Sequence, residues 1–453
     1  MTAIKLILSL LFPLLLGLSL LSAVLKERLA DLGYLERLAA AFLTGSWLLV
    51  LIMFCLPLLG IDLSCASIGL TGSLLVIAML PWTLKTLIGS LRTEMTALPR
   101  NWGFWLLLAL ITIKFSLLTI SSIAQPVLAP DLLTYYALAA KHTFISGQPL
   151  HLFHEPPLPF LLQSWLPFVL GSWQDDLMAV FFPAFLACLT LIFYRGLARH
   201  YNRTGSLFFT FLLLLIPLLA YHGRTAYADL PMACFYSAST IYLFQFILSA
   251  RKNETRSFTF LVLSLLLLGA AVWIKKSGAY YLLLNLVILG LAVFFERLKT
   301  VKLREYLMPL GLLLTMILPW LIFDRSVVLA NTLQQTITGL NTFNQVPGNC
   351  FLGNIAFFIQ ASARSMFLEG NWGLLWQLFI ISVLLYWERV VSRPRIYLFV
   401  LLLINLAALG IIFIFTGQRV FLQDNSLLNR LMLHFAPIVL FFCAELYLSE
   451  NKT

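Results

Sequence analysis

The chain has 453 residues, of which 61% are hydrophobic and only 11% are charged, and its formal net charge is +11. This composition excludes a water-soluble globular domain, in which about 25% of the residues are charged. Apolar runs of roughly bilayer-spanning length recur from end to end. The basic excess is therefore interpreted as charge in the loops of a membrane protein, and no nucleic-acid partner is expected.

Thirteen apolar runs have the length and composition of membrane spans. They cover residues 4–25, 39–60, 65–84, 102–121, 176–194, 205–221, 228–250, 258–275, 278–296, 305–323, 371–388, 395–416 and 430–448. One further run, residues 157–170, is shorter and is punctuated by prolines. Whether it crosses the membrane decides the side of every later loop.

The distribution of lysine and arginine decides this question. If residues 157–170 do not cross, 20 basic residues lie on one side and nine on the other; if they cross, the numbers become 13 and 16. Cytoplasmic loops carry the basic excess, so only the first arrangement fits. We predict thirteen spans, an outer N-terminus, a cytoplasmic C-terminus, and a helix at or dipping into the outer interface over residues 157–170.

Two long segments, residues 122–175 and 324–370, then face the outside, and loops of this length are usually functional. In the first, Asp131 precedes a stripe of Leu132, Tyr136, Ala140 and Phe144, whose spacing predicts an amphipathic helix. Asp131 is either the cap of that helix or a carboxylate placed to accept a proton.

The motif HEPPLPF follows, over residues 154–160. His151, His154 and Glu155 are close enough in sequence to share a cation, although their spacing matches no recognised ligand pattern. Alternatively, they are interfacial polar residues ahead of a helix that begins with proline.

Three later spans carry polar groups at their outer ends. Asp229 begins the motif DLPM, where it is either a helix cap or a functional carboxylate. Lys275 and Lys276 oppose the orientation rule, so they either extend to the interface or bind an anionic phosphate. Arg430 and His434 lie one turn apart at the start of the last span, where His434 is either a packing residue or a functional one.

These groups gather on one predicted face, whereas the predicted cytoplasmic side shows only basic loops. The sequence contains no glycine-rich phosphate loop and no dinucleotide fingerprint. An enzyme built on this face would therefore take its substrates from the membrane and from the outside.

In their order, the motifs resemble those of the polytopic GT-C glycosyltransferases that use polyprenyl-phosphate sugars. The nearest likeness is to bacterial relatives of protein O-mannosyltransferases and lipid A aminoarabinose transferases (glycosyltransferase families 39 and 83). The resemblance runs from about residue 102 to residue 448. The matching positions are Asp131 with Tyr135, Glu155 in HEPPLPF, Asp229 in DLPM, Lys275 in IKKSG, and Arg430 ahead of Pro437.

The resemblance implies a GT-C-like bundle of about 13 transmembrane helices, with interfacial helices in the first outer loop. Residues 1–101 would then be additional N-terminal spans, and residues 102–323 the core with its catalytic outer loop, 122–175. Residues 324–370 would form an outer loop on the acceptor side, and residues 371–453 the C-terminal spans. The implied location is a bacterial inner membrane, with the site facing the periplasm or the outside.

The implied reaction moves a sugar from a polyprenyl phosphate to an acceptor hydroxyl on a lipid, glycan or protein, with inversion at C1. Asp131 would be the general base, and Asp229 would orient the acceptor or the base. Lys275, Lys276 and Arg430 would bind the donor phosphate. The remaining residues expected at the substrate or at a metal are Tyr135, His151, His154, Glu155 and His434.

A divalent cation (Mg²⁺, Mn²⁺ or Zn²⁺) is expected only at His154 and Glu155, whose order departs from the pattern of the family, in which the acid comes first. The main alternative function is a flippase for lipid-linked glycans, or an O-antigen polymerase or ligase. A flippase should line a path to both faces with polar residues, and a polymerase or ligase should lack this ordered set of motifs.

Overall fold

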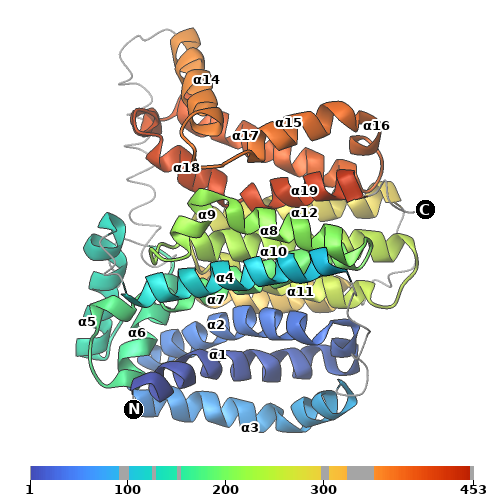
Figure 1. Cartoon of the computed structure of the whole chain (residues 1–453). Helices are drawn as coiled ribbons and strands as arrows, with labels where there is room; N and C mark the ends of the chain where they lie inside the picture. Colours follow the sequence, from blue (N-terminus) through green and yellow to red (C-terminus); the bar gives the residue numbers. More distant parts are fainter. Residues whose placement is uncertain are drawn as a thin grey trace.

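The structure is a computed structural model of the chain, and it describes residues 2–90, 101–124, 129–149, 155–296, 306–323 and 351–448. Every regular element in these ranges is a helix (Figure 1). Within them, nine helices are long and apolar enough to cross a membrane, or ten if one bent pair counts as a span. The prediction of an all-α polytopic membrane protein is confirmed at this level.

Up to Arg251, the described part of the chain contains ten α-helices and three short helical turns. They are α1 (Thr2–Leu25), η1 (Lys26–Asp31), α2 (Tyr34–Leu58), α3 (Cys65–Ser90), α4 (Trp102–Ala124), η2 (Leu132–Tyr136), α5 (Ala137–Ser146), α6 (Leu158–Leu170), η3 (Asp175–Leu177), α7 (Phe181–Ala198), α8 (Arg203–Leu215), α9 (Pro217–His222) and α10 (Asp229–Arg251).

The described elements after Arg251 are also helices. Its elements are α11 (Ser257–Ala271), α12 (Ser277–Glu296), a helix over Tyr306–Phe323, α14 (Phe351–Phe367), α15 (Leu375–Leu385), α16 (Trp387–Val390), α17 (Arg395–Phe415), η4 (Gly417–Leu422), α18 (Ser426–Leu433) and α19 (Ala436–Tyr447).

The predicted count of thirteen spans is matched only in part. Three of the predicted spans contain shorter apolar helices, α8, α11 and α15, of 13, 15 and 11 residues. Fifteen residues of α-helix rise about 22 Å, which is less than the hydrocarbon core of about 30 Å. The number thirteen therefore stays a prediction.

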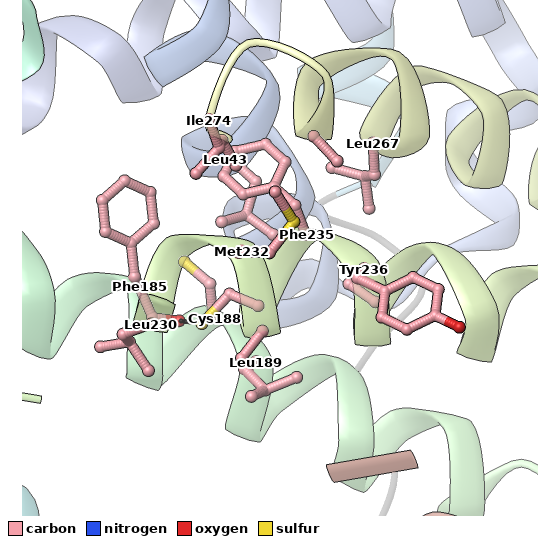
Figure 2. Packing of buried hydrophobic residues seen from close by; sticks show 14 of the residues in the cluster. Leu43, Phe185, Cys188, Leu189, Leu230, Met232, Phe235, Tyr236, Leu267 and Ile274 are labelled. Atoms are coloured by element: carbon pink, nitrogen blue, oxygen red, sulfur yellow. Dashed lines mark hydrogen bonds between the residues drawn. The ribbon is translucent and has the colours of Figure 1, made fainter. Parts of the chain in front are cut away.

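Helix α10 is the centre of the bundle and is buried along almost its whole length. It packs against α7, α11, α12, α18 and α19. Small side chains such as Ala233 and Ser239 allow this close approach, and the Ser239 hydroxyl donates to the Ser264 carbonyl at 2.9 Å. Figure 2 shows Phe235 of α10 among side chains from α2, α7 and α11, and its ring centroid lies 6.0 Å from that of Phe185 on α7.

The three N-terminal helices pack against one another, and α2 also packs against α7 and α11. Close approach of α1 and α2 requires glycine at Gly45, because a Cβ there would lie 1.7 Å from the Pro13 carbonyl oxygen. Residues 1–90 are thus joined to the rest of the bundle by direct helix packing.

Helix α6 lies with α5 at the end of the bundle where the N-terminus lies (Figure 1). Its 13 residues are too few to cross a bilayer, as predicted for residues 157–170. However, all of its residues except Val169 are buried, so α6 is enclosed by protein and does not expose an apolar face. The neighbours that cover it are α1, α2, α3 and α5.

The last predicted span is not one continuous helix. Helix α18 ends at Leu433 and α19 begins at Ala436, and the two are bent by 49°. Pro437 lies in the first turn of α19, where a proline needs no backbone hydrogen bond. The break places His434 at the corner between the two helices.

Candidate functional site

Three other predicted residues converge on the carboxylate of Asp229, at the first turn of α10. Lys275 Nζ donates to Asp229 Oδ1 at 2.6 Å, and Arg430 Nε donates to Asp229 Oδ2 at 2.8 Å. His434 Nε2 lies 3.0 Å from Asp229 Oδ1. Asp229 is fully buried, and a buried carboxylate is stable only when cations and donors compensate it.

Arg430 joins this group to Asp131. Its Nη1 lies 2.5 Å from Asp131 Oδ2, while its Nε contacts Asp229. The Asp131 side chain is 42% exposed, that of Arg430 is 25% exposed, and that of Asp229 is 0% exposed. The cluster of Asp131, Asp229, Lys275, Arg430 and His434, here called the Asp229 cluster, is therefore accessible from the Asp131 side.

Neither aspartate caps its helix through its side chain. Asp131 stands at the N-cap of η2 without a side-chain capping hydrogen bond. Asp229 is the first residue of α10, and the N-cap residue there is Ala228. Both carboxylates are instead paired with cations from distant segments, so the capping interpretation of the sequence does not describe either residue.

A tight turn between α11 and α12 places Lys275 over Asp229. The Gly278 N–H donates to the Lys275 carbonyl at 2.8 Å. A Cβ on Gly278 would lie 2.2 Å from the carbonyl oxygen of Ala271, so the turn closes this tightly only with glycine. Leu158 at the start of α6 donates its N–H to the Trp273 carbonyl at 2.9 Å. The HEPPLPF motif thus supports the lysine turn.

His434 connects the cluster to two buried tyrosines. Its Nδ1 lies 2.8 Å from the Tyr281 hydroxyl, which is on α12. In the neutral ring, Nε2–H donates to Asp229 because a carboxylate only accepts, and Nδ1 accepts from Tyr281. The Tyr281 ring stacks on Tyr236 with centroids 4.0 Å apart, and Asn405 Nδ2 donates to the Tyr236 hydroxyl at 2.9 Å.

Substituting Tyr281→Phe is expected to destabilise the protein by about 1–3 kcal/mol, because the buried Nδ1 of His434 loses its donor. The matched control is Tyr280→Phe, whose half-buried hydroxyl makes a 3.5 Å contact with the Ile404 carbonyl. Thermal unfolding of the two purified variants in one detergent measures the difference. Equal losses of stability in the two variants would mean that the hydrogen bond between Tyr281 and His434 contributes no more to stability than the contact of Tyr280.

Lys276 points away from the Asp229 cluster. Its Nζ lies 4.0 Å from Glu155 Oε1, and its side chain is 59% exposed. The structure therefore separates the two adjacent lysines: Lys275 is partly buried against Asp229, and Lys276 is exposed near Glu155. Sequence reasoning had treated them alike.

The predicted metal site is tested only at Glu155, because His151 and His154 lie outside the described residues. Among the residues that the structure describes, no three of the types His, Cys, Asp and Glu are grouped so that they could hold a metal ion. Glu155 lies beside the Lys276 ammonium. The metal site remains a prediction.

Two tyrosines lie beside the cluster, outside the spanning helices. Burial, and then the negative charge of Glu155, raises the pKa of Tyr135 above its ordinary value. Burial, and then the charge of Asp131, raises the pKa of Tyr227. Tyr227 also lies under Arg430, whose guanidinium carbon is 5.1 Å from the ring centroid. Both hydroxyls therefore stay protonated at neutral pH and can act as hydrogen-bond donors.

Buried acidic residues also occur at the opposite end of the bundle, which corrects the prediction of basic loops alone on that side. Glu36 pairs with Arg199, and Glu445 accepts from the Tyr201 hydroxyl at 2.6 Å. Glu296 lies 3.1 Å from Arg251. Each is a single carboxylate that ties helix ends together, whereas the Asp229 cluster combines two carboxylates with a lysine, an arginine and a histidine.

Three tyrosines around the Asp229 cluster were not predicted from the sequence, namely Tyr281, Tyr236 and Tyr227. The only sequence signal was the pair of tyrosines that follows the lysine turn, and aromatic pairs are common in apolar helices. Nothing in the local sequence indicates that the Tyr281 hydroxyl reaches a histidine 153 positions away.

Known protein families, curated proteins and solved structures were each compared with this chain, and none of the three comparisons found a match. The family resemblance therefore depends on the motifs and their order alone.

Proposed function

We propose that this chain is a membrane glycosyltransferase of GT-C type, which transfers a sugar from a polyprenyl phosphate to an acceptor hydroxyl with inversion at C1. The observation that carries the proposal is the Asp229 cluster. Its five residues come from four segments far apart in sequence, and they meet at one end of a helical bundle with one carboxylate, that of Asp131, partly exposed. A scaffold protein has no need for such convergence.

The two carboxylates have different roles in this proposal. Asp229 is buried, and its oxygens already face Lys275, His434 and Arg430, so it is a positioning residue that holds the two cations. Asp131 is partly exposed and lies beside Arg430 alone among the cluster residues. Asp131 is therefore assigned as the general base for the acceptor hydroxyl.

In the proposed step, the acceptor oxygen forms a bond to C1 of the sugar while its proton passes to the Asp131 carboxylate. The bond between C1 and the phosphate oxygen breaks, and its electron pair leaves with the polyprenyl phosphate. A phosphate is a good leaving group and needs no protonating acid, unlike the sugar oxygen in a glycosidase. Lys275 and Arg430 provide the positive charge that this phosphate requires.

Arg430 links the two halves of this step. In the structure it pairs with both aspartates. A donor phosphate that attracts the guanidinium would weaken its contact with Asp131 and make that carboxylate a better base. Proton transfer to Asp131 then removes one negative charge from the cluster, just as an additional negative charge develops on the phosphate.

With this function we propose the finer topology as well: thirteen spans, a GT-C core over residues 102–323, and a site facing the periplasm of a bacterial inner membrane. The segment 324–370 is proposed to help choose the acceptor. Its residues 351–370 include α14, whose Ser365 hydroxyl donates to Asn429 Oδ1 on α18 at 2.5 Å. Arg430 directly follows Asn429 in sequence. The segment 324–370 therefore contacts α18 at the residue next to the Asp229 cluster.

The function is tested with membranes that contain the chain and matched membranes that lack it, given a panel of labelled polyprenyl-phosphate sugars. Transfer of label to lipid, glycan or protein only in the presence of the chain is the expected result. The same membranes, given a fluorescent analogue of a lipid-linked glycan, measure the translocation of that glycan across the bilayer. Translocation without transfer across the panel would favour the flippase and overturn the proposal.

The adjacent lysines provide an internal test of the phosphate assignment. Lys275→Gln is expected to lower the transfer rate by about 10²–10³-fold, because it removes a charge fixed at the developing phosphate. Lys276→Gln is expected to change the rate by less than about fivefold, because an exposed charge near one carboxylate contributes little. Initial rates at saturating donor, corrected for the amount of folded protein, measure both. Equal losses of transfer rate in the two variants would contradict the assignment of Lys275, rather than Lys276, to the donor phosphate.

A further inference from the structure

A second feature lies at the end of the bundle away from the Asp229 cluster. Where α1 ends and η1 begins, the structure has a cavity of about 1370 Å³. It lies between the last turns of α1, the facing part of α3, the start of α11 and the helix Tyr306–Phe323. In Figure 1, α1 and α3 lie side by side, and this is the end of α1 remote from the N-terminus.

The cavity has an apolar wall and a charged rim. Leu20, Val24, Met79 and Met308 line the wall. Leu20 lies five helical positions before Leu25, the last residue of α1, and Met79 lies six positions before Lys85 in α3. The two apolar walls therefore extend about 7 to 9 Å below the charges. This is the profile of a membrane interface, with hydrocarbon on one side and polar groups on the other.

The rim carries three cationic side chains and one carboxylate, namely Lys26, Arg28, Lys85 and Glu27, and therefore a net positive charge. Lys85 Nζ contacts Glu27 Oε1 at 2.7 Å, but both side chains are more than two-thirds exposed. Such an exposed pair is weak and exchanges readily with another anion. Trp82, also at the cavity, is 43% exposed, as is common for tryptophan at the level of lipid headgroups.

We propose that this cavity binds an anionic phospholipid of the bilayer, with its phosphate among Lys26, Arg28 and Lys85 and its acyl chains along the apolar wall. Charge complementarity selects the anionic headgroup, since a zwitterionic lipid gains little from a net positive rim. The depth of the apolar wall selects a lipid rather than free phosphate. The site is separate from the Asp229 cluster and does not depend on the proposed function.

The experiment is native mass spectrometry of the detergent-purified full chain, titrated with phosphatidylglycerol or with phosphatidylcholine of identical acyl chains. Wild type is expected to bind the first phosphatidylglycerol more tightly than phosphatidylcholine. The double variant Lys26→Gln, Lys85→Gln is expected to lose about thirtyfold in affinity for phosphatidylglycerol, because each cation near an anionic lipid contributes about fivefold. The control Lys252→Gln, Arg393→Gln removes two charges from the same end of the bundle, at positions that do not line the cavity, and is expected to bind like wild type.

A second variant, Ala23→Trp, places an indole ring against the apolar wall, which Ala23 helps to line, while every rim charge remains. It is expected to lose phosphatidylglycerol binding. If the lipid bound only to the rim charges and not within the cavity, this variant would bind it as wild type does. The water-soluble headgroup, glycerophosphoglycerol, is expected not to compete. Equal binding of the two lipids, wild-type binding by both cavity variants, or competition by the free headgroup would each overturn the proposal.

Discussion

Asp131→Asn is expected to lower sugar transfer by about 10²–10⁴-fold, because an amide cannot accept the proton of the acceptor hydroxyl. The fold should survive this change. The Asp131 side chain is 42% exposed and pairs only with Arg430 among the ion pairs of the described residues. Partly exposed ion pairs contribute about 0–1 kcal/mol to stability, so the loss of activity would not be a loss of folding.

The measurement is the initial rate of label transfer with donor and acceptor saturating, alongside a thermal unfolding curve for each protein. Asp176→Asn is the matched control, since Asp176 is an exposed aspartate directly after the segment 122–175 that contains Asp131. It is expected to transfer at the wild-type rate. Robust transfer by Asp131→Asn would remove Asp131 from the chemistry and leave it as a partner of Arg430 alone.

Asp229→Asn is expected to lower the free energy of unfolding by about 3–5 kcal/mol, which is the usual cost of removing one partner from a buried ion pair. The buried carboxylate compensates Lys275 and Arg430 together. The amide keeps the shape of the side chain but not its charge, so both cations would remain at a site that no longer neutralises them. Transfer should be lost as well, because Lys275 and Arg430 would no longer be held in position.

A double variant separates the structural from the chemical loss. Asp229→Asn combined with Lys275→Met removes one charge of each sign, and it should recover part of the stability without recovering transfer. Denaturant titration in mixed micelles gives the free energies for the cycle. The control Glu36→Gln disrupts a buried ion pair at the other end, with Arg199. It should lower stability but leave transfer per folded molecule unchanged. If Asp229→Asn were as stable as wild type, Asp229 would not be the counter-charge of the cluster.

Several features of the site were predictable because they depend on the chain's local pattern. Asp229, Lys275 and Arg430 each stand at the end of a predicted span, and Asp131 lies in the segment that follows the span 102–121. In a polytopic bundle the ends of successive spans lie at only two levels, so counting basic residues was enough to expect these four at the same level. The structure brings them to one cluster at one end of the bundle.

Other features were not predictable, because they depend on contacts between distant segments. Lys275 and Lys276 are adjacent and identical in type, and only the direction of the turn before α12 buries the first and exposes the second. Glu36 stands at the start of an ordinary span, and only the packing of α2 on α7 brings Arg199 to it.

The sequence by itself determined that this chain is a helical membrane protein, where most of its helices lie, and which polar residues sit at the ends of the spans. Hydrophobicity over some twenty residues is a local property that a bilayer selects directly. The tertiary structure alone decided which carboxylate is buried and which is open, that α6 is enclosed by protein, and that the last span bends at His434. Burial and bending depend on side chains hundreds of positions apart, and no local pattern records them.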